Sequence, residues 1–213
     1  MVGSQVNRVS KRGDAGALMM PDGVRAFVAL RLSAEVEQAV ADFIESLRPP
    51  DNARSAVRWV RRANLHLTLR FLGDRVEAPT LERLDRALIR IAAATPCFTI
   101  GVRGIGAFPH LSRPRVVWAG LEGVELIALA AGAERAAIES GLAPEHRAYT
   151  PHLTIGRVVD LGRWSEMRPA IEAAAEREFG RSAARSIILY RSMLAVDSAS
   201  YEELARYPFG GGA

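Results

Sequence analysis

Two hydrophobic periods alternate along the chain, one typical of strands and one typical of helices. Apolar runs, alternating or continuous, predict β-strands at 24–32, 57–60, 65–72, 98–102, 116–119, 152–158 and 186–196. Apolar residues at helical spacing predict four helices between them. The first two begin at the capping residues Ser33 and Thr80, and the others cover 124–140 and 165–179, each followed by a glycine.

These elements repeat in order. Strand, helix, strand, helix, strand occurs once between residues 24 and 102 and again between 116 and 196. The repetition predicts a duplicated, pseudo-twofold α+β fold with two lobes. A groove between the two halves is the expected place for an active site.

Composition limits the class of protein. The chain has 213 residues, of which 49% are hydrophobic, enough for one substantial domain or two small lobes. Residues 1–20 are polar and without period, which predicts a disordered leader before a single folded unit at 21–213. No apolar stretch is long enough for a membrane span or a signal peptide.

Charge and cysteine content add two expectations. The net charge of +4 suits an anionic partner such as RNA, although many proteins with no such partner are equally basic. Cys97 is the only cysteine, which excludes an intrachain disulfide and a cysteine metal cluster. We therefore expect a reducing, cytoplasmic setting.

The tripeptide His-Leu-Thr occurs twice, beginning at His66 and at His152, in a chain with only four histidines and six threonines. Each copy lies in the middle strand of its repeat. Because alternate residues of a strand share a face, each histidine should lie beside its threonine, Thr68 or Thr154. The matched positions favour two halves of one site over two unrelated surface histidines.

Two facing histidines can act as general base and general acid at one phosphorus or carbonyl centre. The threonine hydroxyls could donate hydrogen bonds to oxygens that accumulate charge, and in-line displacement at phosphorus fits best. Zinc would be short of ligands, since no carboxylate or cysteine is at ligand spacing. His110 and His146 lie in loop-like segments and are interpreted as surface residues.

The chain resembles the 2H phosphoesterase superfamily, which is defined by two H-x-[TS] motifs, and within it the RNA 2′,3′-cyclic phosphodiesterase (2′-5′ RNA ligase) family. The resemblance covers residues 22–209 in order. It is carried by segments 25–30, 57–60, 65–73, 107–109, 113–118 and 151–157, and by Arg191, Ser192 and Tyr201.

The resemblance implies an antiparallel sheet with helices in each lobe and the motifs facing across a central groove. It implies metal-independent hydrolysis of RNA or nucleotide 2′,3′-cyclic phosphate ends to 2′-phosphomonoesters, with no cofactor, by a monomer. His66 would donate a proton to the leaving 3′ oxygen and His152 would activate water. Thr68, Thr154 and Arg157 would bind the phosphate, and Phe71 and Tyr149 would contact the nucleotide.

Strict strand alternation conflicts with part of this assignment. It places Arg70, not Phe71, on the face of His66, and Arg157 on the face opposite His152. Gly156 could allow a bulge that redirects Arg157. Phe71 and Tyr149 could equally be packing residues. Two other functions stay open, a non-catalytic nucleotide- or RNA-binding module and a reversible 2′-5′ RNA ligase.

Overall fold

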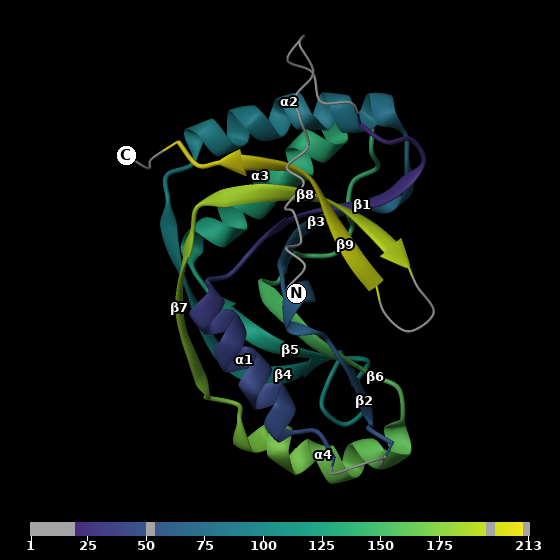
Figure 1. The fold of residues 1–213 in the computed structure, drawn as a ribbon, viewed down its shortest axis with the longest axis vertical. Helices are drawn as coiled ribbons and strands as arrows, with labels where there is room; N and C mark the ends of the chain where they lie inside the picture. The colour runs from purple at the N-terminus through teal and green to yellow at the C-terminus, as the bar shows by residue number, and fades with distance from the viewer. Residues whose placement is uncertain (1–19, 50–53, 195–198, 211–213) are drawn as a thin grey trace, which may run out of the picture.

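The computed structural model describes residues 20–49, 54–194 and 199–210. Within them the chain forms an α+β fold, shown in Figure 1. The helices are α1 (Ala34–Ser46), α2 (Ala78–Ala94), α3 (Val124–Glu139) and α4 (Leu161–Ala173). The strands are β1 (Val24–Leu30), β2 (Val57–Trp59), β3 (Leu67–Val76), β4 (Phe98–Phe108), β5 (Val116–Glu122), β6 (His152–Val158), β7 (Glu178–Ala184), β8 (Ser186–Leu194) and β9 (Ala199–Pro208).

The strands form two antiparallel sheets, one in each lobe. The first has the order β3-β1-β8-β9 and the second the order β2-β6-β5-β4-β7. Helices α2 and α3 pack on the four-stranded sheet at one end of the molecule, and α1 and α4 on the five-stranded sheet at the other (Figure 1). This confirms the predicted α+β architecture with an antiparallel sheet and helices in each lobe.

The two repeats exchange their last strands. In the first sheet β3 and β1 come from the first repeat, and β8 comes from the second. In the second sheet the equivalent positions are held by β6 and β5, with β4 from the first repeat. The matching orders β3-β1-β8 and β6-β5-β4 express the pseudo-twofold relation. Each lobe is therefore completed by a strand from the other half of the chain.

The prediction of a helix over 165–179 is wrong in both boundaries. Helix α4 begins at Leu161, where the side chain of Asp160 accepts a hydrogen bond from the Arg163 N–H, and it ends at Ala173. Phe179 lies in β7, which pairs with β4, and its side chain is buried. Pairing with a neighbouring strand overrides a helical period that ran past the true end of the helix.

Other strand boundaries also differ from the predictions. Strand β4 continues to Phe108 through glycines that suggested a turn, because β5 and β7 pair with it on both sides. Strand β9 was not predicted, since its sequence has little hydrophobic alternation; it pairs with β8 along its length. Helix α2 begins two residues before Thr80, with Pro79 in its first turn.

The described residues form one main apolar core, with a smaller cluster on the other face of the four-stranded sheet. Met20, the first described residue, is buried in the main core, although the leader was expected to include it; residues 1–19 lie outside the described part. The small cluster contains Phe27, Ala29, Ile188 and Tyr190. That second apolar face is where the first motif lies.

Candidate active site

The two motifs come together although they lie in different sheets. His66 precedes β3 in the four-stranded sheet, and His152 is the first residue of β6 in the five-stranded sheet. Strands β3 and β6 contact each other across the boundary between the lobes. The hydroxyl of Tyr149 donates a hydrogen bond to the backbone carbonyl of Thr68, 3.3 Å away, which connects the two motif segments directly.

Both imidazole rings are held in the same way. His66 Nδ1 is 2.7 Å from the carbonyl oxygen of Asn64, and His152 Nδ1 is 2.8 Å from that of Thr150. A carbonyl oxygen only accepts, so each Nδ1 carries the hydrogen and each neutral ring has its Nε2 unprotonated. The backbone two residues before each histidine thus prepares Nε2 for proton transfer.

A bulge in β3 places Phe71 on the His66 face. Ala29 pairs with Thr68, but the adjacent Val28 pairs with Arg70, so β3 contains an additional residue at this point. Phe27 then pairs with Phe71, which packs against the small apolar cluster with the Arg25 guanidinium 4.5 Å from its ring centre.

The same bulge turns Arg70 away from His66, so the expectation from strict alternation is wrong. Arg70 lies opposite Val28 of the main core, and its guanidinium forms an ion pair with Glu134 of α3. Its Nη2 also donates to the Ala143 carbonyl at 2.5 Å. Arg70 therefore joins β3 to α3 instead of facing the site.

A matching bulge in β6 moves Arg157. Trp118 of β5 pairs with Thr154, and the adjacent Val117 pairs with Gly156, so Ile155 is the additional residue. Val116 then pairs with Arg157, which puts Arg157 on the face of Thr154 and His152. Arg157 is exposed there. Burial raises the pKa of the Tyr201 hydroxyl, and the nearby charge of Arg157 opposes part of that rise.

Aromatic rings enclose His66. The ring centres of Phe27 and Tyr201 are 4.7 and 4.9 Å from that of His66, and Tyr190 is at 6.3 Å. The pKa of His66 is lowered to about 4, mainly by burial and to a smaller extent by the Arg31 charge and by electrostatic interaction with His152, while the hydrogen bond to Asn64 opposes this shift. His66 is therefore neutral in the free protein at physiological pH, and the two histidines are near enough to interact electrostatically.

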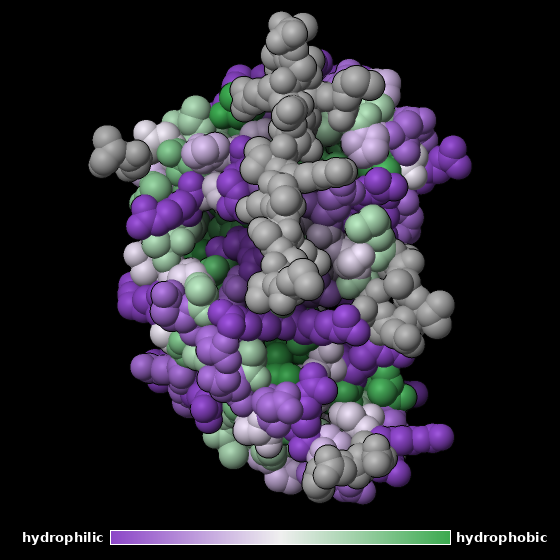
Figure 2. Space-filling view, in the orientation of Figure 1, coloured by the Kyte–Doolittle hydropathy of each residue, from purple (hydrophilic) through white to green (hydrophobic). Residues whose placement is uncertain are grey.

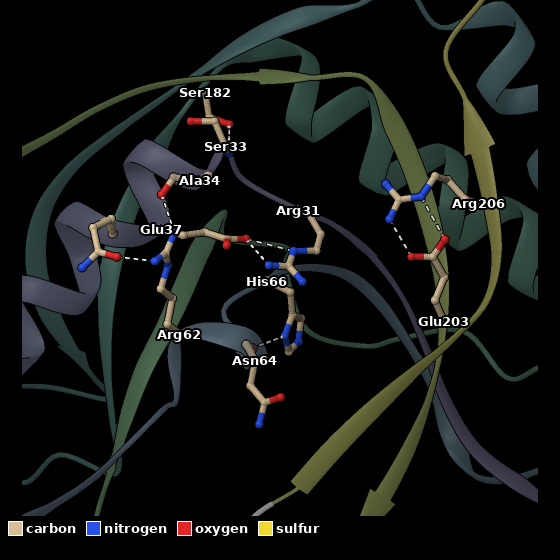
Figure 3. Close-up of polar contacts among 11 residues, drawn as sticks. Arg31, Ser33, Ala34, Glu37, Arg62, Asn64, His66, Ser182, Glu203 and Arg206 are labelled. Atoms are coloured by element: carbon tan, nitrogen blue, oxygen red, sulfur yellow. Dashed lines mark hydrogen bonds and ion pairs between the residues drawn. The ribbon is translucent and has the colours of Figure 1, made fainter. Parts of the chain in front are cut away.

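Arg31 is a site residue that the sequence interpretation missed. It follows β1, beyond the pair formed by Leu30 and Leu67, and lies beside His66 (Figure 3). Its Nε and Nη2 bind Glu37 Oε1 at 2.9 and 2.5 Å, and Glu37 is buried (Figure 3). Alternation could have found it, because Phe27, Ala29 and Arg31 share one face of the strand.

His152 has its own aromatic partners. The ring of Phe108 is edge-on to it at 5.1 Å, and Phe108 contacts Trp118 at 5.2 Å. Trp118 lies over Gly106, where any Cβ would collide with the indole ring. The site thus has an aromatic wall in each lobe, and hydrophilic side chains cross the middle of the face seen in Figure 2, between the lobes.

Tyr149 and the other two histidines lie outside the facing histidine pair. Tyr149 is partly buried against the main core, and burial raises the pKa of its hydroxyl. His110 and His146 are exposed, as expected.

Surface hollows of about 190 Å³ between α2 and α3 and about 300 Å³ beside α4 contain no motif residue. In the described ranges no three His, Cys, Asp or Glu gather to hold a metal ion.

Comparison with known proteins agrees with this geometry. The family model described as the 2′-5′ RNA ligase superfamily matches residues 36–191. The chain belongs to this superfamily, the 2H phosphoesterases. None of the described helices is long and apolar enough to cross a membrane.

Individual members of the superfamily are similar to this chain over most of its length. A protein of Aquifex aeolicus named RNA 2′,3′-cyclic phosphodiesterase is 30% identical over 88% of this chain and 98% of its own length. One of that name from Methanothermobacter thermautotrophicus is 31% identical over 85% and 96%. The crystal structure of E. coli LigT complexed with 3′-AMP is similar with a TM-score of 0.70 and 29% identity, over 88% of this chain and 99% of that one.

Proposed function

We propose that this protein hydrolyses 2′,3′-cyclic phosphodiester ends of RNA or nucleotides to 2′-phosphomonoesters without a metal ion. The observation that carries the proposal is the meeting of two His-Leu-Thr strands from different sheets, each with Nδ1 bound to a backbone carbonyl. The names of the relatives support a cyclic phosphodiesterase activity.

In the proposed mechanism, His152 Nε2 accepts a proton from a water molecule as that water attacks phosphorus. The bond from phosphorus to the 3′ oxygen breaks, and protonated His66 gives its proton to that oxygen. The 2′ oxygen stays bonded to phosphorus. Thr68, Thr154 and Arg157 stabilise the charge on the non-bridging oxygens.

The acid role of His66 requires proton uptake, because its pKa is about 4 in the free protein. A bound anionic phosphate favours the charged imidazole and raises that pKa. Substrate binding and protonation of His66 are therefore coupled in this mechanism. The product isomer tests the assignment, since a 3′-phosphate would mean that the other oxygen leaves.

The test is hydrolysis of a nucleoside 2′,3′-cyclic phosphate in the presence of a chelator. We expect a 2′-phosphate from the wild-type protein and a loss of at least about 100-fold in kcat for His66→Ala and His152→Ala. His110→Ala, which changes an exposed histidine, is the matched control and should keep full activity. Activity in both motif variants would refute the proposal, and saturable binding without turnover by the wild type would favour a binding module.

The monomeric state and the cytoplasmic location are part of the same proposal. Sedimentation equilibrium at micromolar concentrations tests the first. Fluorescence microscopy of the tagged protein in its native cell tests the second.

A further inference from the structure

Arg58 lies on the same sheet face as the second motif. It is the central residue of β2, where Val57 and Trp59 are buried and Arg58 is exposed. Arg58 pairs directly with Arg157 of β6, and directly opposite residues of antiparallel strands project to the same side. The bulge that brings Arg157 to the face of Thr154 and His152 therefore brings Arg58 there too.

The two arginines form an unusual pair. Like charges directly opposite each other destabilise a sheet. Within the described ranges neither guanidinium has an ion pair or a side-chain hydrogen bond. Some exposed arginines elsewhere have carboxylate partners, for example Arg103 with Glu176 at 3.0 Å and Arg168 with Glu172 at 2.7 Å. Others, such as Arg181, have none in the described part of the chain, but Arg58 and Arg157 differ from these because they lie directly opposite each other. The nearby Asp160 is occupied by Arg163.

An anion bound between the two guanidinium groups relieves this repulsion, and the substrate of the proposed reaction supplies one. Arg157 is assigned to the terminal phosphate under the proposed function, on which this inference rests. Arg58 lies on β2, the strand next to the one that contains Arg157, and adjacent strands are about 4.8 Å apart. This step, extended by two flexible side chains, is comparable with the separation of successive phosphates along a nucleic acid strand. A guanidinium suits a phosphodiester because it can donate two parallel hydrogen bonds.

We propose that Arg58 binds the phosphodiester that joins the terminal nucleotide of the substrate to the one before it. The site then has a second phosphate subsite on β2, and it selects oligoribonucleotides with a 2′,3′-cyclic phosphate end over the corresponding mononucleotide. Arg58 takes no part in the proton transfers.

The experiment compares kcat/KM for a nucleoside 2′,3′-cyclic phosphate and for a dinucleotide ending in the same cyclic nucleotide. The wild-type protein should prefer the dinucleotide. Arg58→Gln should lower kcat/KM for the dinucleotide about tenfold, as expected for one charge-assisted contact, and leave the mononucleotide within about twofold. Arg58→Lys should restore part of the loss.

Arg181→Gln is the matched control, because it removes one exposed arginine from β7 at the opposite edge of the same sheet. This control variant should leave kcat/KM unchanged for both substrates. An equal loss on both substrates with Arg58→Gln, or no loss on the dinucleotide, would overturn the inference. Circular dichroism of Arg58→Gln verifies that the fold is kept.

If the wild type hydrolyses neither substrate, the proposed activity fails and not the subsite. Equilibrium binding then decides the subsite, with a 2′-phosphorylated dinucleotide compared with the 2′-phosphorylated mononucleotide. Weaker binding of the dinucleotide alone to Arg58→Gln supports the subsite, and equal binding by variant and wild type excludes it.

Discussion

At the scale of single residues, the environment of each histidine determines what it can do. His66 and His152 occupy the same motif and use the same Nδ1 hydrogen bond to a backbone carbonyl. Only His66 lies among Phe27, Tyr190 and Tyr201, with the Arg31 guanidinium beside it. Identical motifs thus carry histidines with different surroundings.

The low pKa of His66 predicts an acid-sensitive fold. Folded His66 stays neutral down to about pH 4, while the unfolded chain takes up its proton near 6.5, so stability is lost as pH falls between these values. The loss should reach about 3 kcal/mol at pH 4. Urea unfolding at several pH values should show that His66→Asn lacks this component.

His110→Asn provides the control for that measurement, because His110 is exposed. Its stability should follow the wild-type pH dependence. A wild-type protein that lost no more stability than His66→Asn between pH 6.5 and 4 would contradict the buried, neutral state of His66.

At the scale of secondary structure elements, the two bulges decide which side chains face the site. Each one follows its motif threonine, and each moves the residue five positions after the histidine, Phe71 or Arg157, to the motif face. Gly156 is needed at the second bulge because a Cβ there would meet Val57 and would lie 2.9 Å from the ring of Trp59. The register of β6 therefore depends on a glycine packed under β2.

Gly156→Ala should destabilise the protein by about 1–3 kcal/mol, because the added methyl group overpacks the contact with β2. It should also lower activity by displacing Arg157. Gly132→Ala is the matched control: Gly132 lies inside α3, and a Cβ there would have ordinary contacts, 3.7 Å from Ile91. We expect the control to be stabilised by about 0.5–1 kcal/mol. Chemical denaturation measures the free energy of unfolding of both variants. Equal changes in that free energy for Gly156→Ala and Gly132→Ala would refute the packing argument.

At the scale of the whole molecule, strand exchange joins the lobes. Strand β8 of the second repeat lies between β1 and β9, and β4 of the first repeat lies between β5 and β7. Neither lobe can unfold without removing a strand that belongs to the other half of the chain. The hydrogen bond from Tyr149 to Thr68 adds a contact between the motif segments.

This arrangement predicts one cooperative unfolding transition. All three tryptophans lie in the five-stranded lobe, Trp59 in β2, Trp118 in β5 and Trp164 in α4. Tryptophan fluorescence therefore reports on that lobe, and far-ultraviolet circular dichroism on the whole molecule. The two signals should give coincident urea transitions. Separate midpoints would show that the lobes unfold independently.

The sequence by itself determined the class of fold, the repeated order of elements and both histidine–threonine pairs. These follow from hydrophobic period and from a rare repeated motif, which are local properties of the chain. The helix predicted at 165–179 has the wrong boundaries because the pairing of β7, which contains Phe179, with β4 is not a local property of the chain. Strand β9 was not predicted because its pairing with β8, more than its own hydrophobicity, makes it a strand.

Only the tertiary structure decided which residues accompany the motifs. Alternation assigned Arg70 to the site and Arg157 away from it, and one additional residue in each strand reversed both assignments. Arg58 comes to the face of Arg157 because β2 pairs with β6, a strand distant from it in the sequence. A bulge is set by how neighbouring strands and buried side chains fit together, so it leaves little trace in the hydrophobic pattern. The sequence identifies the two histidine–threonine pairs, whereas packing of the folded chain sets the electrostatic surroundings of His66.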